Sequence, residues 1–316
     1  MSPALSVAGL TLSIGGANIV DGVSFSVARG EVMALVGESG CGKSLTAQAA
    51  MRLLPRAVKQ ERGEVRLAGS DLCALPERRL QQLRGRRISM IFQEPQAALD
   101  PLSTVGTQVA ESSGLRGAAA RAAVLAMLDE VGISDPARRI KQYPFELSGG
   151  MAQRVMIATA LISRPDVLIA DEPTTALDVT IQAQILELLR RLAADRGTAI
   201  VLITHDMGVV ADIADRLAVM YAGRIAETGG TAQVFERPRH PYTALLLAAL
   251  PRLTDEPKSQ LAVIAGQVPS PGQFGSACRF AGRCPLATGQ CQAEQPPLRD
   301  MGGGQFSACW HAERIG

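Results

Sequence analysis

The sequence has few of the features that would place it in a membrane or on nucleic acid. Aromatic residues make up only 3% of the 316 residues, and there are three histidines. The 32 basic and 30 acidic residues leave a net charge of +2, so no excess of positive charge favours nucleic acid. The apolar run at residues 244–250 ends at Pro251 and is far shorter than the ~20 residues of a membrane-spanning helix. Residues 1–10 lack the basic start and apolar stretch of a signal peptide.

The composition is that of a folded protein in a reducing compartment. Hydrophobic residues make up 47% and charged residues 20%, which excludes a disordered chain. The length suits one large domain or two smaller ones, whose core needs no disulfide. We therefore expect the six cysteines to be reduced in the cytosol, where paired cysteines are more often metal ligands than disulfides.

Apolar segments of strand length alternate with segments of helical pattern. Residues 7–14 and 20–27 flank Gly15 and Gly16 and predict antiparallel strands. Further strands are predicted at 32–36, 63–67, 88–92, 167–170, 199–203 and 216–221, and helices at 43–54, 180–194 and 207–214. This alternation predicts an α/β fold with a largely parallel sheet. Residues from about 94 to 150 are helical in pattern, with 118–131 the clearest amphipathic stretch, and predict a helical insertion.

Residues 37–44 fit the phosphate-loop pattern G-x-x-x-x-G-K-[ST] between a predicted strand and a predicted helix. They are Gly37, Glu38, Ser39, Gly40, Cys41, Gly42, Lys43 and Ser44. Backbone N–H groups and the helix N-terminus would bind phosphate, Lys43 would reach the β- and γ-phosphates, and Ser44 would bind Mg²⁺. The alternative, a glycine-rich turn without a ligand, is disfavoured by the flanking elements. A side hypothesis is that the helix N-terminus lowers the pKa of Cys41.

Two acids follow the apolar strand at 167–170. At the carboxyl end of a strand, Asp171 can hold Mg²⁺ through water and Glu172 can polarise the attacking water. The alternative is a strand end capped by solvated acids, which is less favoured in a chain that also has a phosphate loop.

Four further motifs resemble those of ATP-binding-cassette (ABC) ATPases. Leu147-Ser148-Gly149-Gly150-Met151-Ala152-Gln153 resembles the signature motif, and Gln93 matches the Q-loop. Ala176-Leu177-Asp178 matches the D-loop, and His205 matches the switch histidine. The resemblance implies a RecA-like ABC ATPase core with an antiparallel β subdomain, the inserted α-helical subdomain at about 94–150, and a nucleotide-binding domain over residues 1–235.

The resemblance also implies a role for each of these motif residues. ATP would be sandwiched head to tail between the phosphate loop of one cassette and Ser148, Gly149 and Gly150 of another. Glu172 and His205 would be catalytic, while Ser44, Gln93 and Asp171 would hold Mg²⁺. Two structural alternatives remain open, in which Ser148 is an ordinary helix N-cap and His205 is a buried histidine without a ligand. The family's adenine-stacking aromatic is missing, and Ile14 is its expected substitute.

The sequence changes after about residue 235, where prolines become frequent and four of the six cysteines lie. We expect residues 236–316 to be a separate C-terminal extension without a core of its own. Arg239-His240-Pro241-Tyr242-Thr243 and the segment from Cys278 to Pro285 resemble the extension of oligopeptide and dipeptide permease ATPases. The alternative for residues 236–265 is a tail that only stabilises the cassette.

Cys278, Cys284, Cys291 and Cys309 fall within this extension. Four thiolates can hold an iron–sulfur cluster or a structural zinc. The spacing lacks the C-x₂₋₄-C pairs of usual zinc sites and favours a four-iron cluster, which some members of the family are understood to carry. Zinc and no metal remain the alternatives.

The resemblance implies the ATP-hydrolysing subunit of a membrane importer for di- or oligopeptides, at the cytoplasmic face of the inner membrane. Its partners would be a related but different ATPase subunit, two transmembrane permease subunits and, through them, a substrate-binding protein. Import of nickel, glutathione or another small solute is the alternative, and a soluble ABC ATPase without a transport role is less favoured.

Overall fold

The computed structural model describes residues 2–175, 177–250 and 264–315. These residues form two compact units. The helical unit contains residues 2–5, 27–31, 74–175 and 177–203, and the loop unit contains residues 6–26, 32–73, 204–250 and 264–315. Ala176 of the expected D-loop, and Pro251 and Pro257, lie outside the described residues. Within the described ranges, no helix is long and apolar enough to cross a membrane.

The helical unit contains three parallel strands in the order β8-β7-β6. Their bounds are Ile88–Ile91 for β6, Val167–Asp171 for β7 and Ala199–Thr204 for β8. Every residue of the three strands is buried, because helices cover a parallel sheet on both faces. This burial explains why each strand is a continuous apolar run, and it confirms the strands predicted here to within one residue at each end.

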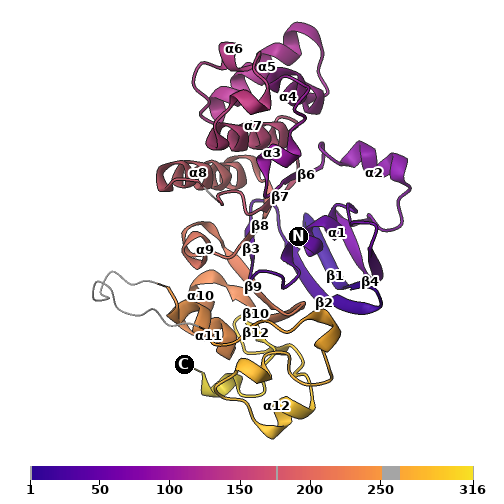
Figure 1. The fold of residues 1–316 in the computed structure, drawn as a ribbon, viewed down its shortest axis with the longest axis vertical. Helices are drawn as coiled ribbons and strands as arrows, with labels where there is room; N and C mark the ends of the chain where they lie inside the picture. Colours follow the sequence, from indigo (N-terminus) through magenta and orange to yellow (C-terminus); the bar gives the residue numbers. More distant parts are fainter. Residues whose placement is uncertain (1, 176, 251–263, 316) are drawn as a thin grey trace. The chain divides into compact units, whose positions relative to one another are not determined.

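The predicted helical insertion is also present in this unit, drawn in magenta in Figure 1. It consists of α3 (Pro95–Ala98), α4 (Val105–Ser113), α5 (Gly117–Glu130), α6 (Pro136–Arg139), the 3₁₀ turn Pro144–Glu146 and α7 (Gly149–Leu161). The start of α4 packs closely on the chain after α6, since a Cβ on Gly106 would lie 2.8 Å from the carbonyl oxygen of Ile140. The unit is completed by α2 (Glu77–Leu83) and α8 (Val179–Arg196).

The loop unit contains two groups of strands. The first has the order β2-β1-β4-β5, with bounds Leu5–Ile14 (β1), Ala17–Val27 (β2), Val58–Leu67 (β4) and Ser70–Asp71 (β5). The second has the order β3-β9-β10-β12-β11, with bounds Val32–Val36 (β3), Arg216–Tyr221 (β9), Arg224–Gly230 (β10), Arg299–Asp300 (β11) and Phe306–Ser307 (β12). Strand β3 pairs parallel with β9, and β10 pairs antiparallel with β9 and β12. Its helices are α1 (Lys43–Ala50), α9 (Met207–Ile213), α10 (Thr231–Glu236), α11 (Pro241–Ala248) and α12 (Gly289–Ala293).

The end of helix α1 corrects the prediction that this helix runs to residue 54. The helix ends at Ala50, and Arg52 adopts a left-handed backbone conformation with a φ of 52°. The Leu53 N–H donates to the Gln48 carbonyl at 2.8 Å and the Arg52 N–H donates to the Ala49 carbonyl at 2.9 Å. These two bonds form a Schellman motif, which usually needs glycine. Here the Arg52 guanidinium donates to the carbonyl oxygen of Cys73 at 3.0 Å and holds the turn.

The C-terminal segment shares the core of the loop unit. Tyr242 and Phe280 are buried in one hydrophobic cluster with Ala34 and Val36 of strand β3. Strand β12 adds to β10 with Glu227 opposite Ser307. The described residues after 235 therefore complete the core of the loop unit, and they also form a small cluster of their own around Cys309, Ala312 and Ile315.

A buried carboxylate joins this segment to strand β10. Glu227 is fully buried and accepts hydrogen bonds from the backbone N–H groups of Arg239 (2.7 Å) and His240 (3.0 Å) and from the Gln305 side chain (2.7 Å). Burial raises the pKa of the Glu227 carboxyl, although these donors oppose the shift. Because a carboxylate without such donors would be costly to bury, Glu227 and the C-terminal segment depend on each other.

We predict that His240 makes the protein less stable in mild acid. Burial lowers the pKa of His240 to about 3, from an ordinary value of 6.5, while its Nδ1 accepts the Tyr242 N–H at 3.1 Å. Because the pKa is lower in the folded state, the unfolded state takes up the proton first as the pH falls below 6.5. The free energy of unfolding should therefore fall by about 2 kcal/mol between pH 7 and pH 5. The raised pKa of Glu227 acts in the opposite direction.

Urea unfolding at several pH values measures this loss. The variant His240→Asn keeps an acceptor for the Tyr242 N–H but cannot take up the proton, so its stability should depend less on pH. Equal pH dependence in the two proteins would contradict the prediction.

Candidate functional site

The glycines of the phosphate loop are required by the backbone. Gly37 and Gly42 have φ values of 150° and 101°, which side chains rarely adopt. A Cβ on Gly37 would lie 2.2 Å from the carbonyl oxygen of Met220, and a Cβ on Gly42 would lie 2.9 Å from Val20 Cγ2. The loop therefore passes against the end of β9 along a path that only glycine allows, between the buried strand β3 and the start of α1.

Lys43 begins helix α1 and points back across the loop. Its Nζ donates to the carbonyl oxygens of Gly37 at 2.7 Å and Glu38 at 3.0 Å, and its side chain is buried. A buried ammonium needs such partners, and phosphate oxygens could replace them. Ser44 follows in the first turn of α1, which places its hydroxyl at the same end of the helix.

Cys41 contradicts the idea of a reactive thiol at the helix N-terminus. Its side chain is 1% exposed. Burial raises the pKa of the Cys41 thiol, and the neighbouring Lys43 ammonium only partly offsets that effect. Desolvation therefore outweighs the helix terminus and the lysine, and Cys41 is a small packing residue rather than a thiolate.

In the helical unit, three of the predicted site residues come together at the carboxyl end of β7. Asp171 is the last residue of the strand and is buried. Glu172 follows it with a φ of 48°, and its N–H donates to the Ile203 carbonyl at 2.9 Å. The Glu172 carboxylate accepts hydrogen bonds from Gln93 Nε2 at 3.3 Å and from Thr175 Oγ1 at 2.8 Å. A non-glycine residue in this conformation is strained, and such strain is concentrated at functional sites.

The signature residues lie at the N-terminus of helix α7. Ser148 is its N-cap, since its side chain accepts the Met151 N–H at 3.4 Å, and Gly149 and Gly150 are the first helical residues. In contrast to the glycines of the phosphate loop, neither of these glycines is required by a close contact with the residues around it. A Cβ on Gly149 would meet nothing within 4 Å among the described residues, and one on Gly150 would meet only Leu177 at 3.8 Å. These two glycines therefore leave the N-terminus of α7 uncovered by side chains of their own.

The remaining predicted residues also lie at element ends. Asp178 is the N-cap of α8, with its Oδ1 accepting the Ile181 N–H at 2.9 Å. His205 is an exposed residue of the loop unit, directly after β8 and before the Asp206 N-cap of α9. Because it is exposed, His205 is not the buried histidine of the structural alternative. Ile14, the expected adenine contact, is exposed at the end of β1.

The four C-terminal cysteines are free thiols that line one small cavity, together with His311. The Cys278 N–H donates to the Cys291 carbonyl at 2.8 Å and brings two of them together. Burial raises the pKa of Cys278 and Cys284 and raises the pKa of Cys309 to about 11. Among the described residues, no group of three or more His, Cys, Asp and Glu side chains is arranged to hold a metal ion. The thiols therefore fit a sulfur-ligated group in number and kind, but their arrangement is not that of a single-ion site.

Sequence reasoning missed the side chains that hold the phosphate loop from outside. Glu38 is bound by Arg283, which lies 245 residues later, and by the hydroxyl of Tyr242. No local pattern marks either contact, because both partners belong to a segment that was expected to be separate.

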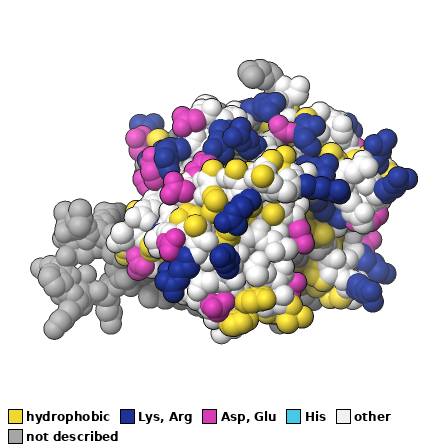
Figure 2. Space-filling view, turned by 90° about the horizontal axis from the view of Figure 1, so that it is seen from above, with side chains coloured by type: hydrophobic (Ala, Val, Ile, Leu, Met, Phe, Trp, Pro, Cys, Tyr) yellow, Lys and Arg dark blue, Asp and Glu magenta, His cyan; other side chains and the backbone are white. Residues whose placement is uncertain are grey.

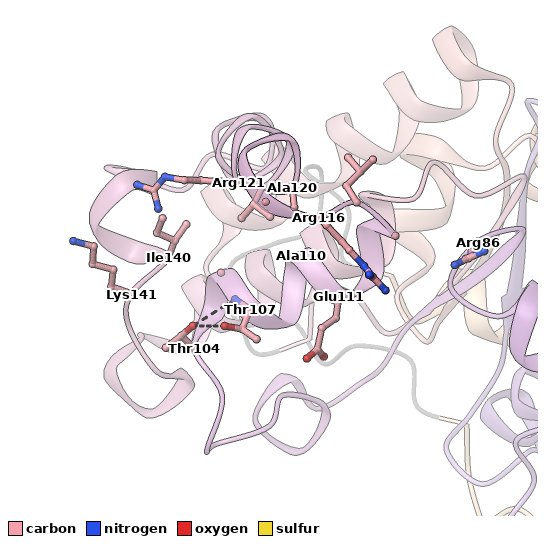
Figure 3. A pocket seen from close by; sticks show the side chains of 15 residues that line it. Arg86, Thr104, Thr107, Ala110, Glu111, Arg116, Ala120, Arg121, Ile140 and Lys141 are labelled. Carbon is pink, nitrogen blue, oxygen red and sulfur yellow. Dashed lines mark hydrogen bonds between the residues drawn. The ribbon is translucent and has the colours of Figure 1, made fainter.

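A large cavity lies within the helical unit, and none of the site residues named above lines it. Its volume is about 820 Å³, and it is lined by α4, α5 and the residues around Lys141. Ile140 and Lys141 lie at one end and Arg86 at the other (Figure 3). Figure 2 shows Lys and Arg side chains scattered among hydrophobic ones over the face it views, rather than gathered into one patch.

Comparison with known proteins decides the family. A family model described as "ABC transporter" matches residues 20–175, and one described as "Oligopeptide/dipeptide transporter, C-terminal region" matches residues 226–291. The dipeptide transport ATP-binding protein DppD of Bacillus subtilis is 47% identical over 319 residues, covering 98% of this chain and 95% of that protein. The chain belongs to the ATP-binding subunits of ABC transporters.

Further relatives and solved structures agree with this assignment. A probable peptide ABC transporter ATP-binding protein of Sinorhizobium fredii, y4tR, is 49% identical over 299 residues, covering 93% of this chain and 89% of the relative. Among solved structures, the dimeric ABC cassette MJ0796 bound to ADP and phosphate superposes with a TM-score of 0.66 at 27% identity, covering 72% of this chain and 98% of that one. The predicted family, the ABC ATPase fold and the ATPase activity are thereby confirmed. ATP and Mg²⁺ are the cofactors expected of this family.

Proposed function

We propose that this ABC subunit hydrolyses ATP to drive import of di- or oligopeptides across the membrane. The observation that carries this proposal is the C-terminal segment, which matches the oligopeptide/dipeptide transporter region and is built into the core beside the phosphate loop. The names of the relatives, which include peptide import ATP-binding proteins, support the same substrate class. The proposed boundary between cassette and extension is residue 235.

The site residues take the following roles in this proposal. Residues 37–44 bind the phosphates, with Lys43 exchanging its two carbonyl partners for phosphate oxygens. Ser44, Gln93 and Asp171 would hold Mg²⁺, which supplies charge neutralisation at the phosphates. Glu172 accepts the proton of the attacking water, and Gln93 and Thr175 orient its carboxylate. His205 contacts the γ-phosphate, and Asp178 stabilises the loop before α8.

The open N-terminus of α7 supports a composite site. Gly149 and Gly150 leave room for a ligand, and a helix N-terminus attracts phosphate through its N–H groups and its dipole. One chain provides one phosphate loop and one such surface, so the two would complete each other across a pair of cassettes. We propose a related but different chain as the partner cassette, at the cytoplasmic face of the inner membrane.

The permease subunits would contact the segment that joins Gln93 to the helical insertion. Helix α3 has no buried residue, and Leu102, shortly after it, is 87% exposed. An exposed leucine beside a polar segment suits the insertion of a helix from a permease subunit. The substrate-binding protein would act through the permease.

Leu102 provides a test of this contact. Replacing Leu102 by Asp should reduce co-purification with the permease subunits at least about ten-fold, because a charge would be buried at the contact. Leu298→Asp is the matched control, since Leu298 is 43% exposed on the C-terminal segment. If Leu102→Asp co-purifies as well as the control, the permease binds elsewhere.

We also propose that Cys278, Cys284, Cys291 and Cys309 hold an iron–sulfur cluster. Their shared cavity and the all-thiol donor set support a cluster. Usual zinc sites contain C-x₂₋₄-C pairs, which the spacing of these four cysteines lacks. The cluster would stabilise a segment that has little helix or strand of its own.

Metal analysis of protein purified without oxygen tests the cluster. We expect a brown protein that contains iron and acid-labile sulfide, and we expect both to be lost in Cys291→Ser. Cys73→Ser is the control, because Cys73 lies on the chain after β5, where its carbonyl oxygen accepts a hydrogen bond from the Arg52 guanidinium. A colourless protein with zinc, or with no metal, would refute the proposal.

A further inference from the structure

Arg283, next to Cys284 in the C-terminal segment, reaches the phosphate loop. Its Nη1 and Nη2 donate to the two carboxylate oxygens of Glu38 at 2.6 and 2.9 Å. The Arg283 side chain is only 7% exposed. A bidentate pair between a guanidinium and a carboxylate fixes orientation as well as distance, and burial protects it from screening by salt.

The remaining donors of Arg283 are also engaged. Nη1 donates to the Tyr221 hydroxyl at 3.3 Å, Nη2 to the Ile264 carbonyl at 3.1 Å and Nε to the Ala265 carbonyl at 2.8 Å. A guanidinium has five N–H donors in a rigid plane, and here its three nitrogens reach five acceptors. Lysine could not reproduce this pattern, since its ammonium is a compact point charge. The side chain is therefore held in one orientation toward Glu38.

Glu38 is held through its backbone as well as its side chain. Its N–H donates to the Tyr242 hydroxyl at 2.9 Å, and its carbonyl accepts from Lys43 Nζ at 3.0 Å. Tyr242 is fully buried, and its ring lies 4.7 Å from that of Tyr221 and 5.4 Å from that of Phe280. Two of the groups that fix Glu38 thus come from the segment after residue 235, and Lys43, the residue proposed to bind the phosphates, depends on the same carbonyl.

We propose that Arg283 is a positioning residue for ATP binding. It holds Glu38, and through Glu38 the carbonyl that orients Lys43, so that the phosphate loop is ordered before ATP arrives. A preorganised loop loses less conformational freedom on binding, and this raises affinity. The C-terminal segment would thereby set the ATP affinity of the cassette. The inference rests on the proposed role of residues 37–44 as the ATP site.

Equilibrium binding of ATP to the full chain tests the inference. Arg283→Met should raise the Kd for ATP roughly ten-fold, and Arg283→Lys should have an intermediate effect. Arg279→Met is the matched control from the same loop. Arg279 is 8% exposed, but its ion pair is with Asp21 at 2.6 Å and its guanidinium lies over Phe274. We expect the two Met variants to lower the melting temperature by similar amounts, while only Arg283→Met weakens ATP binding.

A double-mutant cycle with Glu38→Gln separates positioning from general damage. If Arg283 acts through Glu38, the double variant should have about the same Kd for ATP as the single variant with the higher Kd. The second substitution then removes no further interaction. The inference would be wrong if the two substitutions raised the Kd for ATP independently, so that their factors multiplied, or if Arg279→Met raised the Kd as much as Arg283→Met does.

Lys43→Ala distinguishes the positioning role of Arg283 from the proposed ATP site. If it leaves ATP binding intact, the loop is not the ATP site; if it abolishes binding while Arg283→Met does not weaken it, only the positioning role fails.

Discussion

Replacing Glu172 by Gln is expected to lower the rate of ATP hydrolysis at least about 100-fold while leaving ATP bound. An amide has nearly the shape of the carboxylate and can keep contacts to Gln93 and Thr175, but it cannot accept the proton of the attacking water. The loop proposed to bind ATP, residues 37–44, belongs to the other compact unit of the chain. The variant should therefore separate hydrolysis from binding.

Phosphate release by the assembled transporter measures hydrolysis, and equilibrium titration with ATP measures binding. The control is Glu187→Gln on α8, where an exposed glutamate pairs with Arg190 at 3.1 Å. The control should hydrolyse ATP at the rate of the unmodified protein. Turnover in Glu172→Gln within a few-fold of that rate would show that another group accepts the proton.

Replacing Glu227 by Ala is expected to destabilise the protein by about 3 kcal/mol or more. The change leaves the Arg239 and His240 N–H groups and the Gln305 amide without their common acceptor in a buried place. Each unpaired buried donor costs about 1–3 kcal/mol, and the vacated volume adds a cavity term. Because these donors lie at both ends of the C-terminal segment, that segment should lose its packing first.

Thermal and urea unfolding measure this loss. Glu236→Ala is the matched control, since Glu236 is an exposed residue of α10, nine positions after Glu227. The control should change stability by less than about 0.5 kcal/mol. A similar small effect for Glu227→Ala would mean that water or a rearranged side chain replaces the carboxylate.

The sequence predicted best where one physical effect dominates. Strands β3 and β9 have the predicted bounds because a strand buried on both faces must be a continuous apolar run. The loop between β3 and α1 was recognisable because its backbone path demands glycine at set positions. The family motifs added Gln93, Ser148 and His205, which composition and periodicity would not have marked.

The predictions from the sequence were least accurate where contacts between residues far apart in the chain determine the local structure. The end of α1 was misplaced because Arg52 takes a conformation usually reserved for glycine, held by a carbonyl that lies 21 residues later. Strand β12 has two residues and no periodic pattern, and it exists because β10 offers a partner. The thiol of Cys41 was misjudged because burial, which only the fold reveals, outweighs its place at a helix end.

The pairing of β12 with β10 has a consequence for any shortened form of the chain. Cutting after residue 235 would keep every motif of the nucleotide site but would uncover the backbone N–H and C=O groups of β10, together with apolar surface that Tyr242 and Phe280 now cover. An open strand edge beside exposed apolar surface pairs readily with other chains. The intact chain instead presents β11, a two-residue strand, at that side of the sheet. A minimal cassette cut from this protein should therefore aggregate, and the C-terminal segment protects solubility as well as the site.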